Sequence, residues 1–198
     1  SSETVFSPEI VRYKTLEDGD SLALHIFKPR NMQAGEKRPA IVYFFGGGWK
    51  LGTPIQFYRE CAYYASKGMV AVSVDYRIGY LHHSTPFESF EDAKDAICWL
   101  RSHASDYQLD PDKIAVAGGS AGGHLAAALG TIGSDETVPA GYRPNLSVLY
   151  YPVIDMVSRG YGFPEIKRDF EKISPIHHVS EATPSTLILL GTKDPIVS

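Results

Sequence analysis

Apolar runs rich in β-branched and aromatic residues recur along this chain, separated by polar or glycine-containing stretches. Several runs are apolar at nearly every position rather than at alternate ones. This pattern is typical of a parallel sheet that helices cover on both faces, because neither face of a strand then meets water. The predicted strands are SLALHIF (21–27), AIVYFF (40–45), MVAVSV (69–74), KIAVAG (113–118), LSVLYY (146–151) and STLILL (185–190).

Helical patterns alternate with these strands, over residues 56–68, 88–104 and 120–130. In the second predicted helix, four apolar residues recur on one stripe: Phe90, Ala93, Ile97 and Leu100. The alternation predicts an α/β fold with a mostly parallel, doubly wound sheet, helices on both faces and an antiparallel edge formed by the first strands.

No linker divides the chain, so we expect residues 1–198 to form a single domain. Two segments, 133–145 and 158–170, are polar and loop-rich, and the second is a candidate lid over a site.

Composition narrows the possible partners. The chain has 198 residues, a net charge of −4 and a pI near 6.0, without the basic stripe that nucleic acid requires. It also lacks an apolar run long enough to cross a membrane. Its first residues are SSETVF, which fits either a trimmed chain or a mature protein whose signal peptide has been removed. A secreted or periplasmic location is therefore slightly favoured over the cytoplasm.

Cys61 and Cys98 lie inside predicted helices without the spacing of metal ligands. We expect two buried free thiols, with a disulfide between them as the alternative, and no metal site.

Residues 118–122, GGSAG, match the pattern G-x-S-x-G between a predicted strand and a predicted helix. A strand-to-helix turn of this kind is tight and strained, and it exposes the hydroxyl of its serine beside the amino terminus of the helix. The alternative, a phosphate or dinucleotide loop, would need a Gly-Lys-Ser/Thr sequence or an acidic residue at the next strand end, and neither is present. The pattern therefore predicts that Ser120 is a nucleophile.

FFGGGW (44–49) follows an earlier predicted strand. Consecutive glycines let a backbone approach a ligand with its N–H groups exposed, as an oxyanion hole requires. We expect the N–H groups of Gly47, Gly48 and Ala121 to be the donors. Trp49 and Tyr151 are candidates to line the substrate pocket, although an aromatic residue is more often part of the core.

Together these segments resemble the α/β-hydrolase fold, and within it the hormone-sensitive-lipase-like and acetyl-xylan-esterase-like carboxylesterases. The resemblance rests on FFGGGW, VDYR (74–77), TPFESFEDAKDAICWLR (85–101), LDPDKIAVAGGSAGGHLAAAL (109–129) and LILLGTKDPIV (187–197). One departure is Phe45, because most members have a histidine there that orients the glycine loop.

The resemblance implies that Asp194 is the acid of a Ser-Asp-His triad, with Asp155 in reserve, and that no cofactor takes part. None of the seven histidines fits the role of base, and each is interpreted as structural: His25, His82, His83, His103, His124, His177 and His178. We therefore expect the chain to lack the last strand and helix of the fold. A C-terminal fragment or second chain would supply the histidine and pair beside residues 186–190, whose apolar run would otherwise form an unprotected sheet edge.

Asp75 and Arg77 follow a predicted strand and suggest an internal ion pair. The implied activity is that of a serine carboxylic-ester hydrolase acting on short-chain acyl, and possibly acetyl, esters of small molecules or carbohydrates. Two alternatives share the fold: a prolyl-oligopeptidase-like serine peptidase and a non-catalytic receptor for a small ligand.

Overall fold

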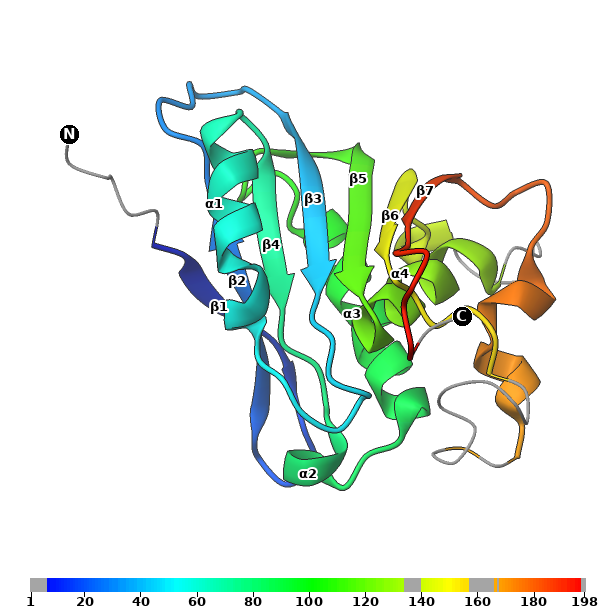
Figure 1. The fold of residues 1–198 in the computed structure, drawn as a ribbon. Helices are drawn as coiled ribbons and strands as arrows, with labels where there is room; N and C mark the ends of the chain where they lie inside the picture. The colour runs from blue at the N-terminus through cyan, green and yellow to red at the C-terminus, as the bar shows by residue number, and fades with distance from the viewer. Residues whose placement is uncertain (1–6, 134–139, 157–165, 167, 197–198) are drawn as a thin grey trace.

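Seven strands form one sheet in the order β1-β2-β4-β3-β5-β6-β7 (Figure 1). The computed structural model describes residues 7–133, 140–156, 166 and 168–196. The first two strands pair antiparallel, β2 pairs antiparallel with β4, and the remaining neighbours are parallel. The prediction of a mostly parallel α/β sheet with an antiparallel edge is confirmed. The strands are β1 Glu9–Thr15, β2 Ser21–Phe27, β3 Arg38–Phe44, β4 Val70–Val74, β5 Leu109–Gly119, β6 Leu146–Tyr150 and β7 Ser185–Leu189.

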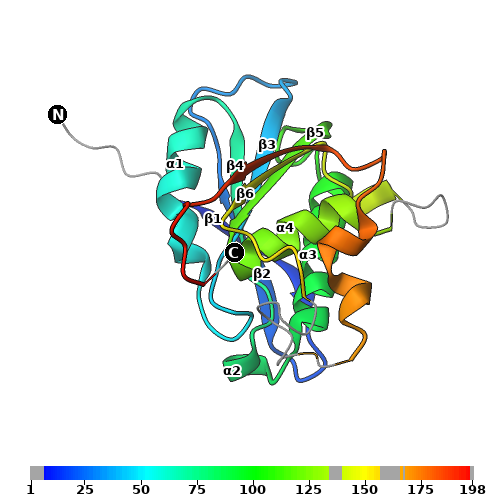
Figure 2. The same ribbon diagram turned by 45° about the vertical axis from the view of Figure 1, so that its right-hand side comes forward.

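Helices cover both faces of the sheet. Helix α1 (Tyr58–Ser66) packs on one face against β4, β2 and β3, whereas α3 (Pro86–Ser102) and α4 (Ala121–Thr131) lie together on the other (Figure 1, Figure 2). The predicted stripe on α3 is buried at all four positions. The remaining helical segments are short: η1 Pro54–Phe57, α2 Gly79–His82, η2 Ala140–Tyr142, η3 Phe170–Ile173 and η4 Pro175–His178.

The centre of the sheet explains why the middle strands are apolar throughout. Val42 of β3 pairs with Val72 of β4 on one side and Val116 of β5 on the other, and all three are fully buried. Helices shield both faces here, so every side chain of β4 is buried.

Some details of the fold differ from the sequence predictions. Strand β1 and helix α2 were not predicted as elements. Cys98 is exposed rather than buried, whereas Cys61 is buried as expected, and both thiols are free. Of the candidate lid at 158–170, residues 158–165 and 167 lie outside the described residues. Among the described helices, none has the length and apolar character to span a membrane.

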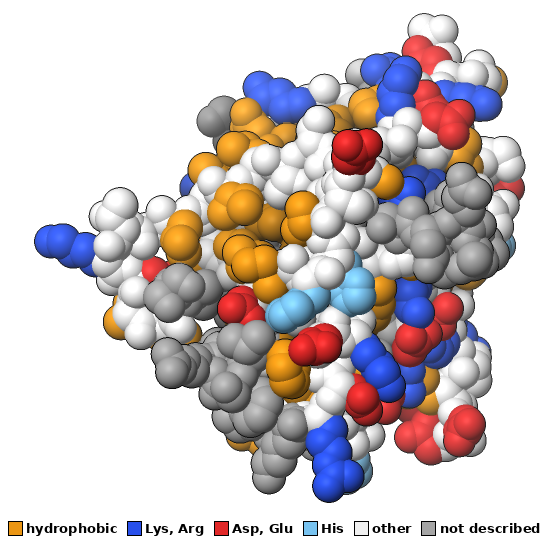
Figure 3. All heavy atoms as spheres, turned by 90° about the vertical axis from the view of Figure 1, so that its right-hand side faces the viewer, with side chains coloured by type: hydrophobic (Ala, Val, Ile, Leu, Met, Phe, Trp, Pro, Cys, Tyr) orange, Lys and Arg blue, Asp and Glu red, His pale blue; other side chains and the backbone are white. Residues whose placement is uncertain are grey.

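Strand β7 is the exposed edge of the sheet in the described structure, with β6 as its neighbour. Its apolar side chains and the next residue are about half exposed: Leu187 52%, Ile188 50%, Leu189 45% and Leu190 47%. An apolar hollow of about 210 Å³ lies between α4, β6, β7 and η4. Hydrophobic side chains gather on this side of the molecule (Figure 3). That a further segment covers the edge remains a prediction.

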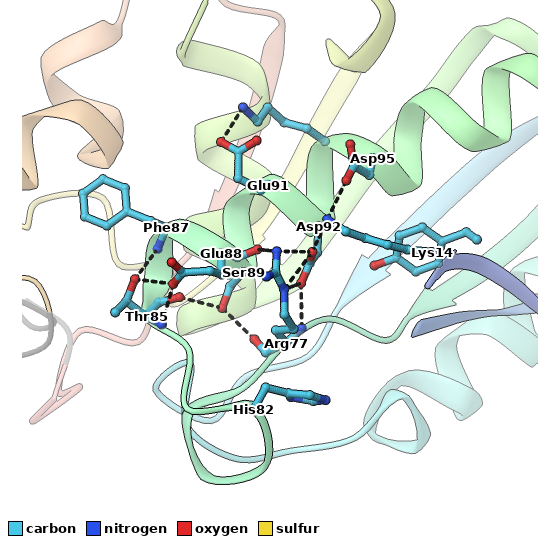
Figure 4. Close-up of polar contacts among 12 residues, drawn as sticks. Lys14, Arg77, His82, Thr85, Phe87, Glu88, Ser89, Glu91, Asp92 and Asp95 are labelled. Atoms are coloured by element: carbon cyan, nitrogen blue, oxygen red, sulfur yellow. Dashed lines mark hydrogen bonds and ion pairs between the residues drawn. The ribbon is translucent and has the colours of Figure 1, made fainter. Parts of the chain in front are cut away.

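Near the β1 edge of the sheet, a buried carboxylate of α3 joins β1 and the loop after β4 (Figure 4). Asp92 of α3 is fully buried and accepts hydrogen bonds from the Arg77 guanidinium at 2.8 and 2.9 Å and from Lys14 Nζ of β1 at 2.6 Å. It also accepts the backbone N–H of Arg77 at 2.9 Å. The internal ion pair expected here is thus confirmed for Arg77, and its partner is Asp92 of α3.

Asp92→Ala should lower the free energy of unfolding by about 3 kcal/mol, because it leaves the Arg77 guanidinium facing a buried space without its carboxylate partner and removes one of the two carboxylates that bond Lys14. Asp95, whose side chain is 52% exposed, also bonds Lys14 at 2.6 Å and supplies the matched control. Asp95→Ala should change the stability by less than about 1 kcal/mol. Urea unfolding followed by circular dichroism measures both, and equal losses would show that the burial of Asp92 does not matter.

Candidate active site

Ser120 occupies the single-residue turn between β5 and α4, with φ 54° and ψ −118°. A non-glycine residue rarely adopts these angles, and such strain is typically held in place by the structure around it. Here the Ser120 N–H donates to the carbonyl of Tyr150 at 3.0 Å, while its own carbonyl accepts the His124 N–H at 2.9 Å. The turn is thus fixed by β6 on one side and by α4 on the other.

The small residues around Ser120 follow from how closely β3 and α4 cross. A Cβ added to Gly122, in the first turn of α4, would overlap the carbonyl oxygen of Phe44 at the end of β3. The same crossing places Gly46 next to the nucleophile, because a Cβ on Gly46 would lie 3.4 Å from the Ser120 Cβ. The glycine loop and the Ser120 turn are therefore immediate neighbours.

The glycine loop presents backbone N–H groups that have no acceptor within the described structure. Gly47 has φ 142°, and a Cβ there would overlap the Leu51 carbonyl, so a larger residue would displace the loop. Gly46 is used otherwise, because its N–H donates to Gln56 Oε1 at 2.6 Å. Among the described hydrogen bonds, none has the N–H of Gly47, Gly48 or Ala121 as its donor. These are the three groups expected to bind an oxyanion.

Phe45 anchors the loop in the core. Its ring stacks on Tyr76 with centroids 4.1 Å apart and an interplanar angle of 14°, and the Tyr76 hydroxyl donates to the Phe45 carbonyl at 2.5 Å. Phe45 is the position at which the sequence departs from the resemblance, and here its stacked ring and bonded carbonyl hold the glycine loop.

The side chain of Trp49 does not line a pocket as expected. It is 1% exposed, and its Nε1–H donates to His124 Nδ1 at 3.2 Å. Its carbonyl accepts the Gly79 N–H at 2.9 Å, and the Lys50 carbonyl accepts the Tyr80 N–H at 3.1 Å, so α2 also holds the loop. The tryptophan belongs to the core because the chain turns inward directly after the glycines.

His124 is buried beneath the Ser120 turn. Its Nε2–H donates to the carbonyl of Ile173 at 2.7 Å, which leaves Nδ1 as the acceptor for Trp49. Burial lowers the pKa of His124 to about 4, so its imidazole is neutral at pH 7. Both ring nitrogens are bonded away from the Ser120 hydroxyl, in keeping with a structural role.

The loop after β7 brings Asp194 to the same hollow as Ser120. This hollow measures about 720 Å³, and Ser120, Tyr151, Asp194 and their neighbours in 191–196 line it. Asp194 is half-buried, and its Oδ1 accepts the Ile196 N–H at 2.8 Å. Tyr151 is 45% exposed with φ 38°, a second strained residue beside the nucleophile. The reserve candidate, Asp155, is not part of this lining.

All seven histidines lie in the described part of the chain, and no hydrogen bond there joins an imidazole nitrogen to the Ser120 hydroxyl. Several have other partners, such as Tyr58 for His25 and the carbonyl of Glu171 for His178. Within the described residues, no group of three or more His, Cys, Asp or Glu side chains is arranged to hold a metal ion. The residues gathered here are a serine hydroxyl, a carboxylate and backbone N–H donors.

Comparison with known proteins places this geometry in context. The model of the BD-FAE family matches residues 24–158. Two curated esterases of Mycobacterium tuberculosis are similar: LipQ is 29% identical over 88% of this chain and 46% of its own length, and LipC is 28% identical over 91% and 50%. This chain thus spans about half the length of these relatives.

Among solved structures, this chain is similar to esterase 2 of Thermogutta terrifontis. The form phosphoramylated by tabun has a TM-score of 0.88 and 37% identity, and the match covers 96% of this chain and 74% of that chain. The propionate-bound form has a TM-score of 0.83 and 36% identity over 92% and 71% of the two chains. The butyrate-bound form has a TM-score of 0.87 and 35% identity, and the match covers 96% of this chain and 74% of that chain.

Proposed function

The chain belongs to the BD-FAE family, and on that basis we propose that it forms the nucleophile-bearing part of a serine carboxylic-ester hydrolase for short-chain acyl esters. One observation carries the proposal. Ser120, on a strained turn, shares a hollow with Asp194 and lies beside a glycine loop in which the N–H groups of Gly47 and Gly48 have no acceptor in the described structure. The esterase relatives support the same reaction class.

The proposed reaction proceeds in two steps. A histidine oriented by Asp194 takes the proton of the Ser120 hydroxyl as its oxygen attacks the acyl carbonyl, and the alcohol leaves with that proton. The N–H groups of Gly47, Gly48 and Ala121 stabilise the negative oxygen of each tetrahedral intermediate. Water then attacks the acyl-enzyme and releases the carboxylic acid. These steps need no cofactor.

The base histidine is proposed to come from a segment outside residues 1–198, either a later part of the same polypeptide or a second chain. Two observations support this source. No imidazole among the described residues bonds the Ser120 hydroxyl, and β7, the strand before Asp194, exposes an apolar edge beside which a further strand can pair. In the structure of the complete protein, an imidazole should lie within hydrogen-bond distance of both Ser120 and Asp194. Contact of His124 with the Ser120 hydroxyl would contradict this assignment.

Short acyl groups are proposed from two lines of support. Esterase 2 of Thermogutta terrifontis has been solved with propionate and with butyrate bound. In this chain Tyr151 stands in the lining of the hollow beside Ser120, where its ring can contact a small acyl or alcohol group.

Replacing the nucleophile tests the proposed function. In the complete protein, Ser120→Ala should lower kcat for p-nitrophenyl butyrate by about 10⁴-fold or more, because the attacking oxygen is lost. Ser147→Ala is the matched control, since the Ser147 hydroxyl is buried, has no hydrogen-bond partner among the described residues, and should not affect turnover. A fluorophosphonate should label Ser120 and no other serine. A protein that binds a small acid tightly but neither hydrolyses esters nor reacts with the probe would instead be a receptor.

Replacing a loop glycine tests the oxyanion hole. Gly47→Ala should reduce kcat by about 10²-fold or more, because the new Cβ overlaps the Leu51 carbonyl and moves the N–H donors. Gly35→Ala is its control: Gly35 also has a positive φ, of 82°, but a Cβ there meets nothing within 4 Å. Its turnover should match the parent protein. Equal activity of both variants would exclude Gly47 from the oxyanion hole.

A further inference from the structure

We propose that the hydrogen bond from Trp49 to His124 is the link that positions the glycine loop against the Ser120 turn, which makes both residues positioning residues for catalysis. The inference rests on the proposed function, and it adds two side chains to the machinery of that site. Neither side chain touches the reacting atoms.

Trp49 and His124 each lie close in sequence to one part of the proposed oxyanion hole, Trp49 in the glycine loop and His124 in helix α4. Trp49 directly follows Gly48, the second loop donor, whereas His124 lies one helical turn after Ser120 and Ala121. The indole Nε1 and imidazole Nδ1 are 3.2 Å apart, and the two rings meet edge to face at 84° with centroids 5.1 Å apart. A single side-chain contact therefore joins the loop that carries two donors to the helix that carries the third.

The backbone of Trp49 indicates that this contact is maintained against strain. Its φ of 58° is an outlier for a bulky residue, which rarely adopts the left-handed region unless its surroundings hold it there. The indole is held by burial and by its bond to His124. Without an acceptor, its N–H would be left unsatisfied in the core, so the strained loop geometry depends on the partner across the gap.

His124 is prepared for the role of acceptor. The carbonyl of Ile173 receives its Nε2–H at 2.7 Å, which fixes the tautomer and leaves the Nδ1 lone pair directed to Trp49. Full burial disfavours the imidazolium, which would have no lone pair to offer. A neutral histidine in this one tautomer thus links η3, α4 and the glycine loop.

Three variants of the complete protein separate a positioning role from simple packing. Trp49→Phe removes the indole donor and keeps an aromatic ring. His124→Leu removes both hydrogen bonds at similar volume. His124→Asn returns an acceptor oxygen close to the place of Nδ1. The chain also offers a matched control in Trp99→Phe, because Trp99 stacks on His103 with centroids 3.9 Å apart outside this site.

The measurements are kcat and KM for p-nitrophenyl butyrate, together with ¹⁵N–¹H spectra of the indole groups, of which the chain has two. Trp49→Phe and His124→Leu should each lower kcat by about tenfold to a hundredfold with little change in KM, because a misplaced oxyanion hole weakens transition-state binding. The Trp49/His124 double variant should lose no more than the worse single variant. His124→Asn should recover most of the loss, and only His124→Leu should shift the Trp49 indole signal strongly.

Opposite outcomes overturn the inference. Unchanged kcat in Trp49→Phe, losses that multiply in the double variant, or failure of His124→Asn to restore the rate would each exclude a positioning role. If Trp49→Phe does not fold, the comparison of His124→Asn with His124→Leu decides the question alone. If the parent protein neither hydrolyses esters nor reacts with a fluorophosphonate, the proposed function itself is refuted. If the parent protein is active and every variant turns over normally, only the positioning role is refuted.

Discussion

The site depends on a steric constraint: where β3 ends, nothing larger than glycine fits between its backbone and the first turn of α4. The Phe44 carbonyl occupies the place of a Gly122 side chain, and Phe44 pairs with Gly118 across the parallel β3–β5 ladder. Two segments that lie far apart in sequence are thereby pressed together just past the carboxyl ends of their strands. The strained turn and the glycine loop are consequences of this crossing, since each chain must change direction within a residue or two of it.

The side chains that hold the glycine loop by hydrogen bonds are uncharged, and the charges of Lys14, Arg77 and Asp92 are paired with one another. Gln56 accepts the Gly46 N–H, Tyr76 donates to the Phe45 carbonyl, and His124 accepts from Trp49. A carboxylate in place of the Gln56 amide would bring negative charge close to where an oxyanion must form, and would oppose it. Asp92 and Asp95 instead neutralise Lys14 and Arg77 within their own cluster. The separation of charged and uncharged anchors suits a site that must stabilise one developing negative charge.

The parts of the fold and site that sequence predicted are those with a local cause. Ser120 and the glycines are recognisable because the turn, the strand before it and the helix after it are contiguous. Strand β1 was missed because its pairing is irregular between Arg12 and Lys14 and much of it is exposed, which blurs the alternation of polar and apolar residues. The burial of Trp49, the partner of Arg77 and the role of Gln56 were also missed. Each depends on a contact between segments that no local pattern joins: Trp49 with His124, Arg77 with Asp92 and Gly46 with Gln56.

The strand order distributes the site over regions of unequal local stability. The glycine loop follows β3, the fourth of seven strands, and Ser120 follows the adjacent β5, so both stand on ladders flanked on each side. Asp194 follows β7, whose described ladder partner is β6. The free energy of local opening falls from the centre of a sheet to its edge. Fraying of β7 would therefore move Asp194 away from Ser120 while the Ser120 turn stays intact, and a segment paired beside this strand would prolong the time that the two residues remain together.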